Sequence, residues 1–402
     1  MPLPDKRLSV LVATAGVAGG VIGAAYLGLL RLTDHLIGPT HWQDVPHLFI
    51  LVGAGVVIAA LTRWLGNPPN VELLVDNIHL SGGSDDIRSL RSLIPISLVC
   101  VGAGGGLGPE APLVQATGST GSWLAARAGL GADELRIVTL TGMAAGFTVL
   151  FGAPVGSAVF ALEILHRRGL EYYEALVPAL GGSLFGYVVY VLLTRSGFHP
   201  VFSFPAPGAL RAVDFAWAVG CGLAGAVVAW AFSYGSRTLG RLSHRLPALA
   251  RPVAGGLALG LLALASPYAL TNGELQIDHV TAVRMSALAL AGAALAKLIG
   301  TSVTMAAEWR GGFIIPLFFV GACLGTAAHV TFGGSNQWVL VTALMVACNV
   351  GVTKTALGST LVVAEMAGMA VLPTTLVAAL VALLLTSQVD LIHTQREREP
   401  VG

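Results

Sequence analysis

Apolar residues in this chain gather into long runs that glycine, proline and charged residues interrupt at short intervals. The longest runs reach the roughly 20 residues that a membrane-spanning helix needs, because each residue adds about 1.5 Å to a helix. The runs lie at about 8–32, 47–65, 91–106, 112–127, 135–151, 154–166, 173–194, 213–234, 250–270, 282–305, 313–330, 337–350, 355–366 and 371–388. The pattern predicts an all-α polytopic membrane protein held in a lipid bilayer.

Four of these runs, 112–127, 154–166, 313–330 and 355–366, are short and are bounded by glycine, proline or charge. We expect them to be half-helices and re-entrant pieces rather than complete spans. Backbone that breaks at membrane depth is tolerated only inside protein or beside water. The breaks are therefore the positions where a functional site is expected.

The composition agrees with a membrane class. The chain has 402 residues, of which 55% are apolar and 11% are charged, whereas soluble domains carry about 25% charged residues. A net charge of +1 gives no basic surface for nucleic acid. The four cysteines are widely spaced and predict single buried thiols, so we expect no metal ion and no cofactor.

Basic residues cluster between the runs and predict an orientation. Clusters stand at 6–7, 167–168, 237–251 and 396–398. Because positively charged loops stay in the cytoplasm, we expect all four clusters and both termini on that side. The first run, which follows the first cluster, has no clear signal-peptidase site and is expected to be retained. We expect an integral protein of the cell membrane.

The two halves of the chain, about 8–195 and 213–390, resemble each other. Residues 108–113 match residues 312–317 at an offset of 204, and both segments place a glycine four residues before a proline. Glu163 and Glu365 later stand at an offset of 202. Such duplication is typical of inverted-repeat transporters, in which paired broken helices meet near the midplane. Two helix amino ends that meet there would bind an anion through free N–H groups.

Glu110 is the residue that we single out. It follows the glycine-rich segment 104–108, and Pro112 fits the first turn of a helix. An ionised carboxylate there competes with an anion for the same N–H groups, and a protonated one leaves them. Glu110 would then be both a gate and a proton carrier. The alternative is a glutamate that only caps a helix.

Several motifs, in the same order along the chain, resemble those of the CLC chloride channel and transporter family. Residues 108–112 (Gly-Pro-Glu-Ala-Pro) resemble the family's Gly-Arg-Glu-Gly-Pro segment, and residues 311–316 resemble its Gly-Gly-x-Phe-x-Pro segment. Residues 142–163 resemble the family's helix pair that contains Asn-Ala-Pro, and residues 364–366 resemble its second-half counterpart. The resemblance implies a CLC-like inverted repeat that transports chloride or a similar small anion.

The resemblance also implies roles for particular residues. Glu110 would be the gating glutamate, and the backbone around Gly108, Ala111, Phe313 and Ile314 would bind the anion. The family is dimeric, with a separate pore in each subunit, so a homodimer is expected. Residues 1–402 would form a single transmembrane domain without the family's carboxy-terminal regulatory domain.

Some positions depart from the family pattern. Pro109 replaces an arginine, and Ala111 replaces a glycine. The family's early Gly-Ser-Gly-Ile-Pro segment is not recognisable, and in the nearest stretch Asn67 is the candidate for a polar contact with the anion. His393 falls where the family has a pore-lining tyrosine; it is either a titratable pore ligand or a solvated residue of the tail.

One departure concerns protons. The family's proton-coupled exchangers carry a second glutamate just after the position of Glu163, and this chain has Ile164 there. We expect Glu163 itself to be structural. Either anions flow passively, or protons reach Glu110 by another route, such as water.

Two other classes of function stay open at this point. A proton-coupled carrier of an organic substrate would also use Glu110 as its titrating group. A membrane enzyme is disfavoured, because the chain has no zinc-protease, serine-hydrolase or nucleotide-loop string. The glycines of 102–108 could suggest a dinucleotide loop, but the hydropathy of the chain argues against the soluble unit that such a loop needs.

Overall fold

The structure, a computed structural model, describes residues 6–41, 44–68, 87–166, 173–388 and 391. In these residues the regular secondary structure consists of helices and of one isolated bridge between Gly108 and Gly312. The helices of the first half are α1 (Lys6–Ile37), α2 (Asp44–Leu65), α4 (Leu90–Gly102), α5 (Glu110–Arg127), α6 (Ala132–Phe151), α7 (Pro154–Glu163) and α8 (Leu176–Thr194). Those of the second half are α9 (Ala212–Ser243), α10 (Arg251–Ala265), α11 (Glu274–Ala282), α12 (Ala287–Ala306), α13 (Ile314–Phe332), α14 (Gln337–Thr353), α15 (Ala356–Ala367) and α16 (Leu372–Thr386).

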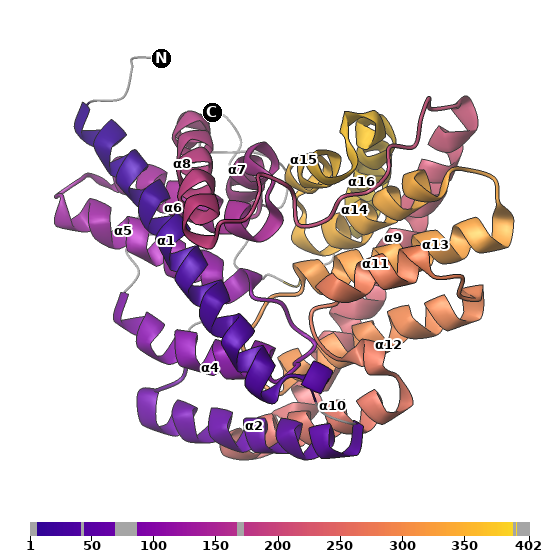
Figure 1. Cartoon of the computed structure of the whole chain (residues 1–402), viewed down its shortest axis with the longest axis horizontal. Coiled ribbons are helices and arrows are strands. Elements are labelled where there is room, and N and C mark those ends of the chain that lie inside the picture. Colours follow the sequence, from indigo (N-terminus) through magenta and orange to yellow (C-terminus); the bar gives the residue numbers. More distant parts are fainter. Residues whose placement is uncertain (1–5, 42–43, 69–86, 167–172, 389–390, 392–402) are drawn as a thin grey trace.

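Helices pack in the same pattern in both halves. In the first half α1 contacts α6 and α8, and α5 contacts α6; in the second half α9 contacts α14 and α16, and α13 contacts α14. The pairs α2–α10 and α7–α15 then join one half to the other. Figure 1 shows the two sets side by side, with the early helices in indigo and magenta and the late ones in orange and yellow. The predicted all-α fold with two repeated halves agrees with this packing.

The predicted breaks fall close to helix ends. The run 112–127 begins at Glu110 as α5, and the runs 154–166 and 355–366 are the short helices α7 and α15. The run 313–330 is the helix α13, which begins at Ile314 and continues to Phe332. It is one of nine helices in the described residues that are long and apolar enough to cross a membrane. Its last turn contains the polar residues His329 and Thr331, and the helix continues through them to Phe332.

Glycines let α7 and α15 cross with their backbones in contact. A Cβ on Gly156 of α7 would collide with the backbone of Val362 in α15, and a Cβ on Gly358 of α15 would collide with the backbone of Phe160 in α7. Small residues at a crossing are the usual way for membrane helices to approach closely. The two short helices therefore form one rigid joint between the halves.

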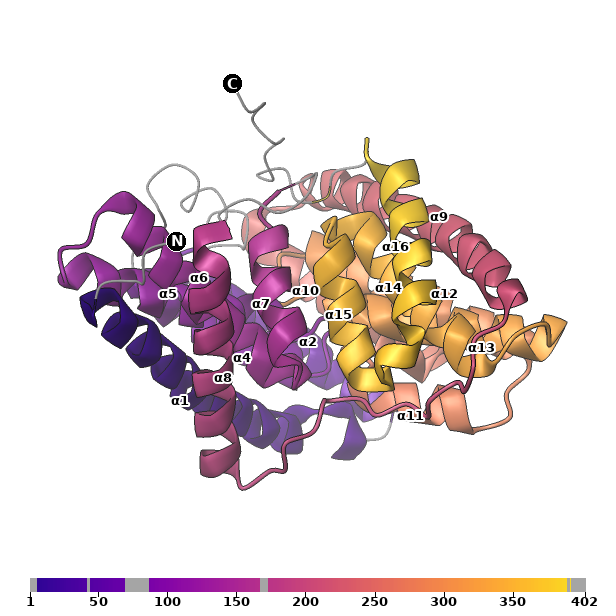
Figure 2. The ribbon, with the colours of Figure 1, turned by 90° about the horizontal axis from the view of Figure 1, so that it is seen from above.

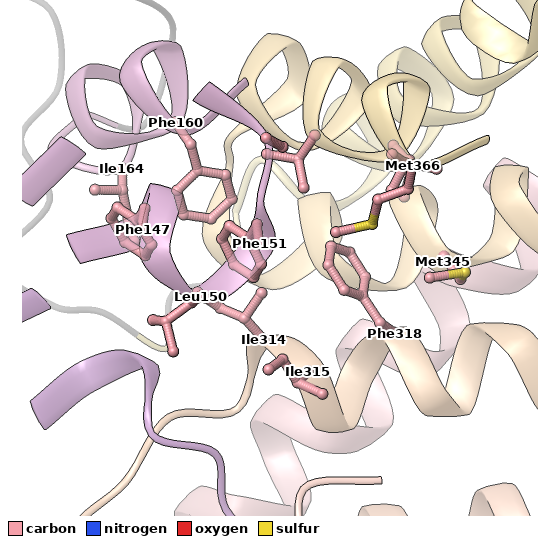
Figure 3. Packing of buried hydrophobic residues seen from close by; sticks show 14 of the residues in the cluster. Phe147, Leu150, Phe151, Phe160, Ile164, Ile314, Ile315, Phe318, Met345 and Met366 are labelled. Carbon is pink, nitrogen blue, oxygen red and sulfur yellow. The ribbon is translucent and has the colours of Figure 1, made fainter. Parts of the chain in front are cut away.

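Aromatic side chains fill the space between this joint and α13. The ring centroids of Phe147 and Phe160 lie 4.9 Å apart, and those of Phe151 and Phe318 lie 6.2 Å apart. Figure 3 shows these rings with Ile314 at the start of α13. Because Phe318 comes from the second half and the other three rings from the first, this cluster fixes where α13 begins.

Candidate functional site

Helices α5 and α13 begin at one place, where the two halves are joined through their backbones. Gly108 donates its N–H to the carbonyl of Gly312 at 2.8 Å, and Gly312 donates its N–H to the carbonyl of Gly108 at 2.7 Å. Each glycine stands two residues before its helix begins, at Glu110 and at Ile314. Unpaired N–H groups and the partial positive charges of two helix ends are therefore brought together.

The carboxylate of Glu110 lies at this junction. Its Oε1 accepts a hydrogen bond of 2.6 Å from the backbone N–H of Ile315, so an acid of the first half sits on the amino end of a helix of the second half. The side chain is 1% exposed, and its Oε2 has no hydrogen-bond partner among the described residues. A Cβ on Gly108 or on Gly312 would collide with the carboxylate. The two glycines therefore leave the space that the carboxylate occupies.

Glu110 also lies at the boundary between two cavities. The inner cavity, of about 270 Å³, is lined by Glu110 and, near the ends of α7 and α16, by Ile164 and Leu391. The outer cavity, of about 600 Å³, is lined by Pro109 and by residues of the segments 196–201 and 270–276. Figure 2 shows the segment that follows α8 on one face and the ends of α7 and α16 on the opposite face. Since consecutive residues line different cavities, the carboxylate separates them.

The two cavities differ in charge. The outer cavity is lined by three acids, Asp34, Asp44 and Glu274, and by Arg31. Among the described residues that line the inner cavity, the charged ones are Glu110 and Arg310, and most of the others are apolar. An anion in the inner cavity would therefore meet little charge apart from one guanidinium and one carboxylate.

Most of the residues expected to bind an anion lie together at the junction. Ala111, Phe313 and Ile314 line the inner cavity beside Glu110. Gly108 lies there as well, but its N–H is engaged by Gly312, so it joins the halves instead of offering a donor to an anion.

Two further candidates lie elsewhere. The side-chain oxygen of Asn67 accepts a hydrogen bond of 2.9 Å from Nη2 of Arg310, and Asn67 is not among the residues that line the inner cavity. The structure thus places Asn67 next to a cation rather than at the helix ends. His393 lies outside the described residues.

Sequence reasoning missed three residues of the site. Ile315 supplies the N–H that holds Glu110, and its signal was its place in the first turn of the broken helix. Arg310 and Gln115 line the inner cavity. Arg310 had a signal in the sequence, a charge directly before the glycine pair of the family motif, whereas nothing local distinguishes Gln115 from other polar residues.

The other repeated acids form a closed pair at the α7–α15 joint. Glu163, at the end of α7, accepts N–H groups of Leu357 at 3.2 Å and Gly358 at 2.7 Å, in the first turn of α15. Glu365, near the end of α15, accepts N–H groups of Val155 at 3.1 Å and Gly156 at 3.4 Å, in the first turn of α7. Each acid therefore caps the helix of the other half.

Lys297 is fully buried in α12. Its Nζ donates to the carbonyls of Leu270 at 2.5 Å and Thr271 at 3.0 Å and to the side chain of Gln276 at 3.2 Å. Three acceptors use the three N–H groups of an ammonium. Because these three residues also line the outer cavity, Lys297 stabilises its wall from behind.

Comparison with known proteins decides the family. Residues 54–387 match the model of a family described as the voltage gated chloride channel, which covers well over half of the chain. The chain belongs to this CLC family. The resemblance read from the motifs is confirmed, and so is the class of integral membrane protein. CLC proteins are transporters or channels, so the function is transport rather than enzymatic catalysis.

The similarity to known relatives and solved structures covers nearly the whole chain. A chloride/fluoride channel protein of Pseudomonas syringae pv. tomato is 26% identical over 96% of this chain and 86% of its own length. The crystal structure of a CLC-type fluoride/proton antiporter superposes with a TM-score of 0.85 at 22% identity, covering 98% of both chains. A slow cyanobacterial Cl⁻/H⁺ antiporter superposes with a TM-score of 0.84 at 19% identity, covering 96% of this chain and 95% of its own. At these identities the two structures show the fold.

Proposed function

We propose that this CLC protein carries a small anion, chloride or fluoride, across the membrane through a passage that the carboxylate of Glu110 closes. One observation carries the proposal: Oε1 of Glu110 holds the N–H of Ile315 where two helix ends meet. That N–H is a donor an anion would use, because helix amino ends bind anions through backbone N–H groups. The inner and outer cavities supply the approaches to it.

The passage opens when the transported anion replaces the carboxylate of Glu110 at the helix ends. The ionised carboxylate and a halide cannot both occupy the small space over Gly108 and Gly312. A proton neutralises Glu110 and removes its charge-assisted hydrogen bond to Ile315. The anion then takes the N–H groups at the start of α13, around Phe313 and Ile314, and that of Ala111 at the start of α5.

The same carboxylate couples anion movement to protons. Ile164, which lines the inner cavity, cannot carry a proton. The cavity itself extends to Glu110, so we propose that water in it brings protons to the carboxylate. Three similar proteins, a chloride/fluoride channel and two proton antiporters, support both the anion class and the coupling.

Orientation and assembly follow from charge and from family membership. Arg251, in the basic cluster of 237–251, forms an ion pair of 2.5 Å with Glu308, close in sequence to Arg310 of the inner cavity. We propose that this basic face is cytoplasmic, that the protein resides in the cell membrane and that it forms a homodimer with one passage per subunit.

The experiment that tests the gate is anion flux from proteoliposomes into which the purified protein is reconstituted. For Glu110→Gln we expect flux that no longer changes between acidic and alkaline pH, because the glutamine neither ionises nor takes up a proton. Chloride and fluoride flux are measured in parallel with a proton-sensitive dye, which reports coupling.

The matched control is Glu134→Gln. Glu134 is a half-buried acid far from Glu110 in sequence that accepts the N–H of Gly131 at the start of α6, and its variant should retain the pH response. An unchanged pH response in Glu110→Gln would refute the gate. Transport of organic anions in preference to both halides would instead favour the alternative of a proton-coupled carrier of another substrate.

A further inference from the structure

The inner cavity is lined by two side chains whose buried donors have no hydrogen-bond partner in the part of the chain that the structure describes. Gln115 is 1% exposed and lines the cavity, and its Nε2 is buried without a hydrogen-bond partner among the described residues. Arg310 lines the same cavity, and its Nε is likewise buried and without a partner there. A buried donor without a partner destabilises a protein, so two of them on the wall of one cavity favour a site for a ligand with acceptor groups or negative charge.

Two neighbouring side chains fix the position of Arg310. Its own N–H donates to Sγ of Cys100 in α4 at 3.2 Å, and its Nη2 donates to Asn67 at 2.9 Å. Glu308, the nearest acid along the chain, is bound to Arg251. The guanidinium is therefore held by a neutral amide and keeps its full positive charge toward the cavity.

Chemistry decides the class of ligand. Arginine and the amide nitrogen of glutamine are both donors, and the guanidinium is a permanent cation. The remaining wall is mostly apolar, with Leu93, Met143, Phe147 and Ile164 among its residues. A cavity of about 270 Å³ with these walls suits a small monovalent anion that has lost part of its water.

We propose that Arg310 and Gln115 bind the transported anion in the inner cavity, at a side-chain site separate from the backbone N–H groups at the paired helix ends. This inference rests on the proposed function and adds the residues that set affinity on the inner side. An anion held by Arg310 and Gln115 waits beside Glu110. When the carboxylate takes up a proton and leaves the N–H of Ile315, the anion moves to that place.

The test measures initial flux against anion concentration, varied separately on each face of proteoliposomes with oriented protein. For Arg310→Gln and for Gln115→Leu we expect the KM on the inner face to rise about tenfold, the effect of losing one charge-assisted or buried hydrogen bond. The KM on the outer face should stay within twofold of wild type. Arg310→Lys, which keeps the charge and loses the planar donor array, should recover part of the affinity.

Arg127→Gln is the matched control, because Arg127 is an exposed cation that stacks on Trp123 at the end of α5. An inner KM unchanged in both variants overturns the inference, and so does an equal rise on both faces, which would indicate damage to the fold. The proposed function is judged separately by wild-type flux and by Glu110→Gln. If the wild type carries halide with a pH response while Arg310→Gln behaves like it, the side-chain site alone is refuted.

Discussion

Two pairs of helix ends, α5 with α13 and α7 with α15, are built on the same plan and differ in their acids. At α7–α15 both halves supply a glutamate, and each carboxylate accepts two N–H groups of the opposite helix. At α5–α13 the first half supplies Glu110, the second half has Ile314 at the equivalent position, and one carboxylate oxygen has no partner in the described structure. The symmetric pair is satisfied and closed, whereas the asymmetric pair leaves one helix end for a replaceable ligand.

The α7–α15 joint should tolerate a larger side chain less well than the α5–α13 junction does. Gly358→Leu places a side chain against the backbone of Phe160 in α7, where neither helix can withdraw because each caps the other. We expect almost no monodisperse protein after extraction into detergent, measured by size-exclusion chromatography. Gly292→Leu is the control, because nothing lies within 4 Å of a Cβ at Gly292. Normal yield for Gly358→Leu would show that the α7–α15 crossing is not rigid.

At the α5–α13 junction a larger side chain should change transport rather than folding. In Gly312→Ala the added Cβ collides with the carboxylate of Glu110 and displaces it from the N–H of Ile315. We expect flux at alkaline pH to rise about tenfold, toward the rate at acidic pH, because losing a hydrogen bond to a charged group costs about 1.5–3 kcal/mol. Gly292→Ala should not change the pH profile. A pH profile identical to wild type in Gly312→Ala would mean that the carboxylate does not close the passage there.

Removal of an acid from the symmetric pair should cost stability and spare gating. Glu163→Ala leaves the N–H groups of Leu357 and Gly358 without their acceptor, which costs about 1–3 kcal/mol. Denaturation monitored by tryptophan fluorescence should show this loss, and the pH response of flux should remain. Glu365→Ala should behave in the same way. A lost pH response in either variant would make these acids part of the proton route.

The smallest effect is expected beside the inner cavity. Asn67→Asp puts a carboxylate next to Nη2 of Arg310 and partly neutralises the guanidinium. The KM on the inner face should rise by a few-fold, since an exposed ion pair is worth about 0.2–1 kcal/mol. Asn67→Ser, which remains neutral, should stay close to wild type. A lower inner KM in Asn67→Asp would place the anion away from Arg310.

Much of the fold could be predicted from short segments of the sequence. The length of the apolar runs predicted the helices, and the glycine and proline breaks predicted where α5, α7 and α15 begin. The repeat offset placed Glu110 opposite Ile314 before any coordinates were considered. These predictions needed only the length of a span and the behaviour of glycine and proline.

The rest of the site depends on contacts between residues that are far apart in sequence. The bond between Glu110 and Ile315 joins positions 205 residues apart. Gln115 faces a cavity whose opposite wall comes from the other half, and no local pattern states which side of α5 that is. Arg310 was visible as a charge, but its partner Asn67 lies 243 residues away. Sequence reasoning therefore reached Glu110 and missed the donors around it.

The two hydrogen bonds between Gly108 and Gly312 involve main-chain atoms alone. Mutation of neighbouring side chains can therefore change the chemistry at the junction without separating the two halves. A protein family can then diverge until only about a fifth of its residues agree, as the 22% identity with a structural neighbour illustrates, while the register of its two halves stays fixed.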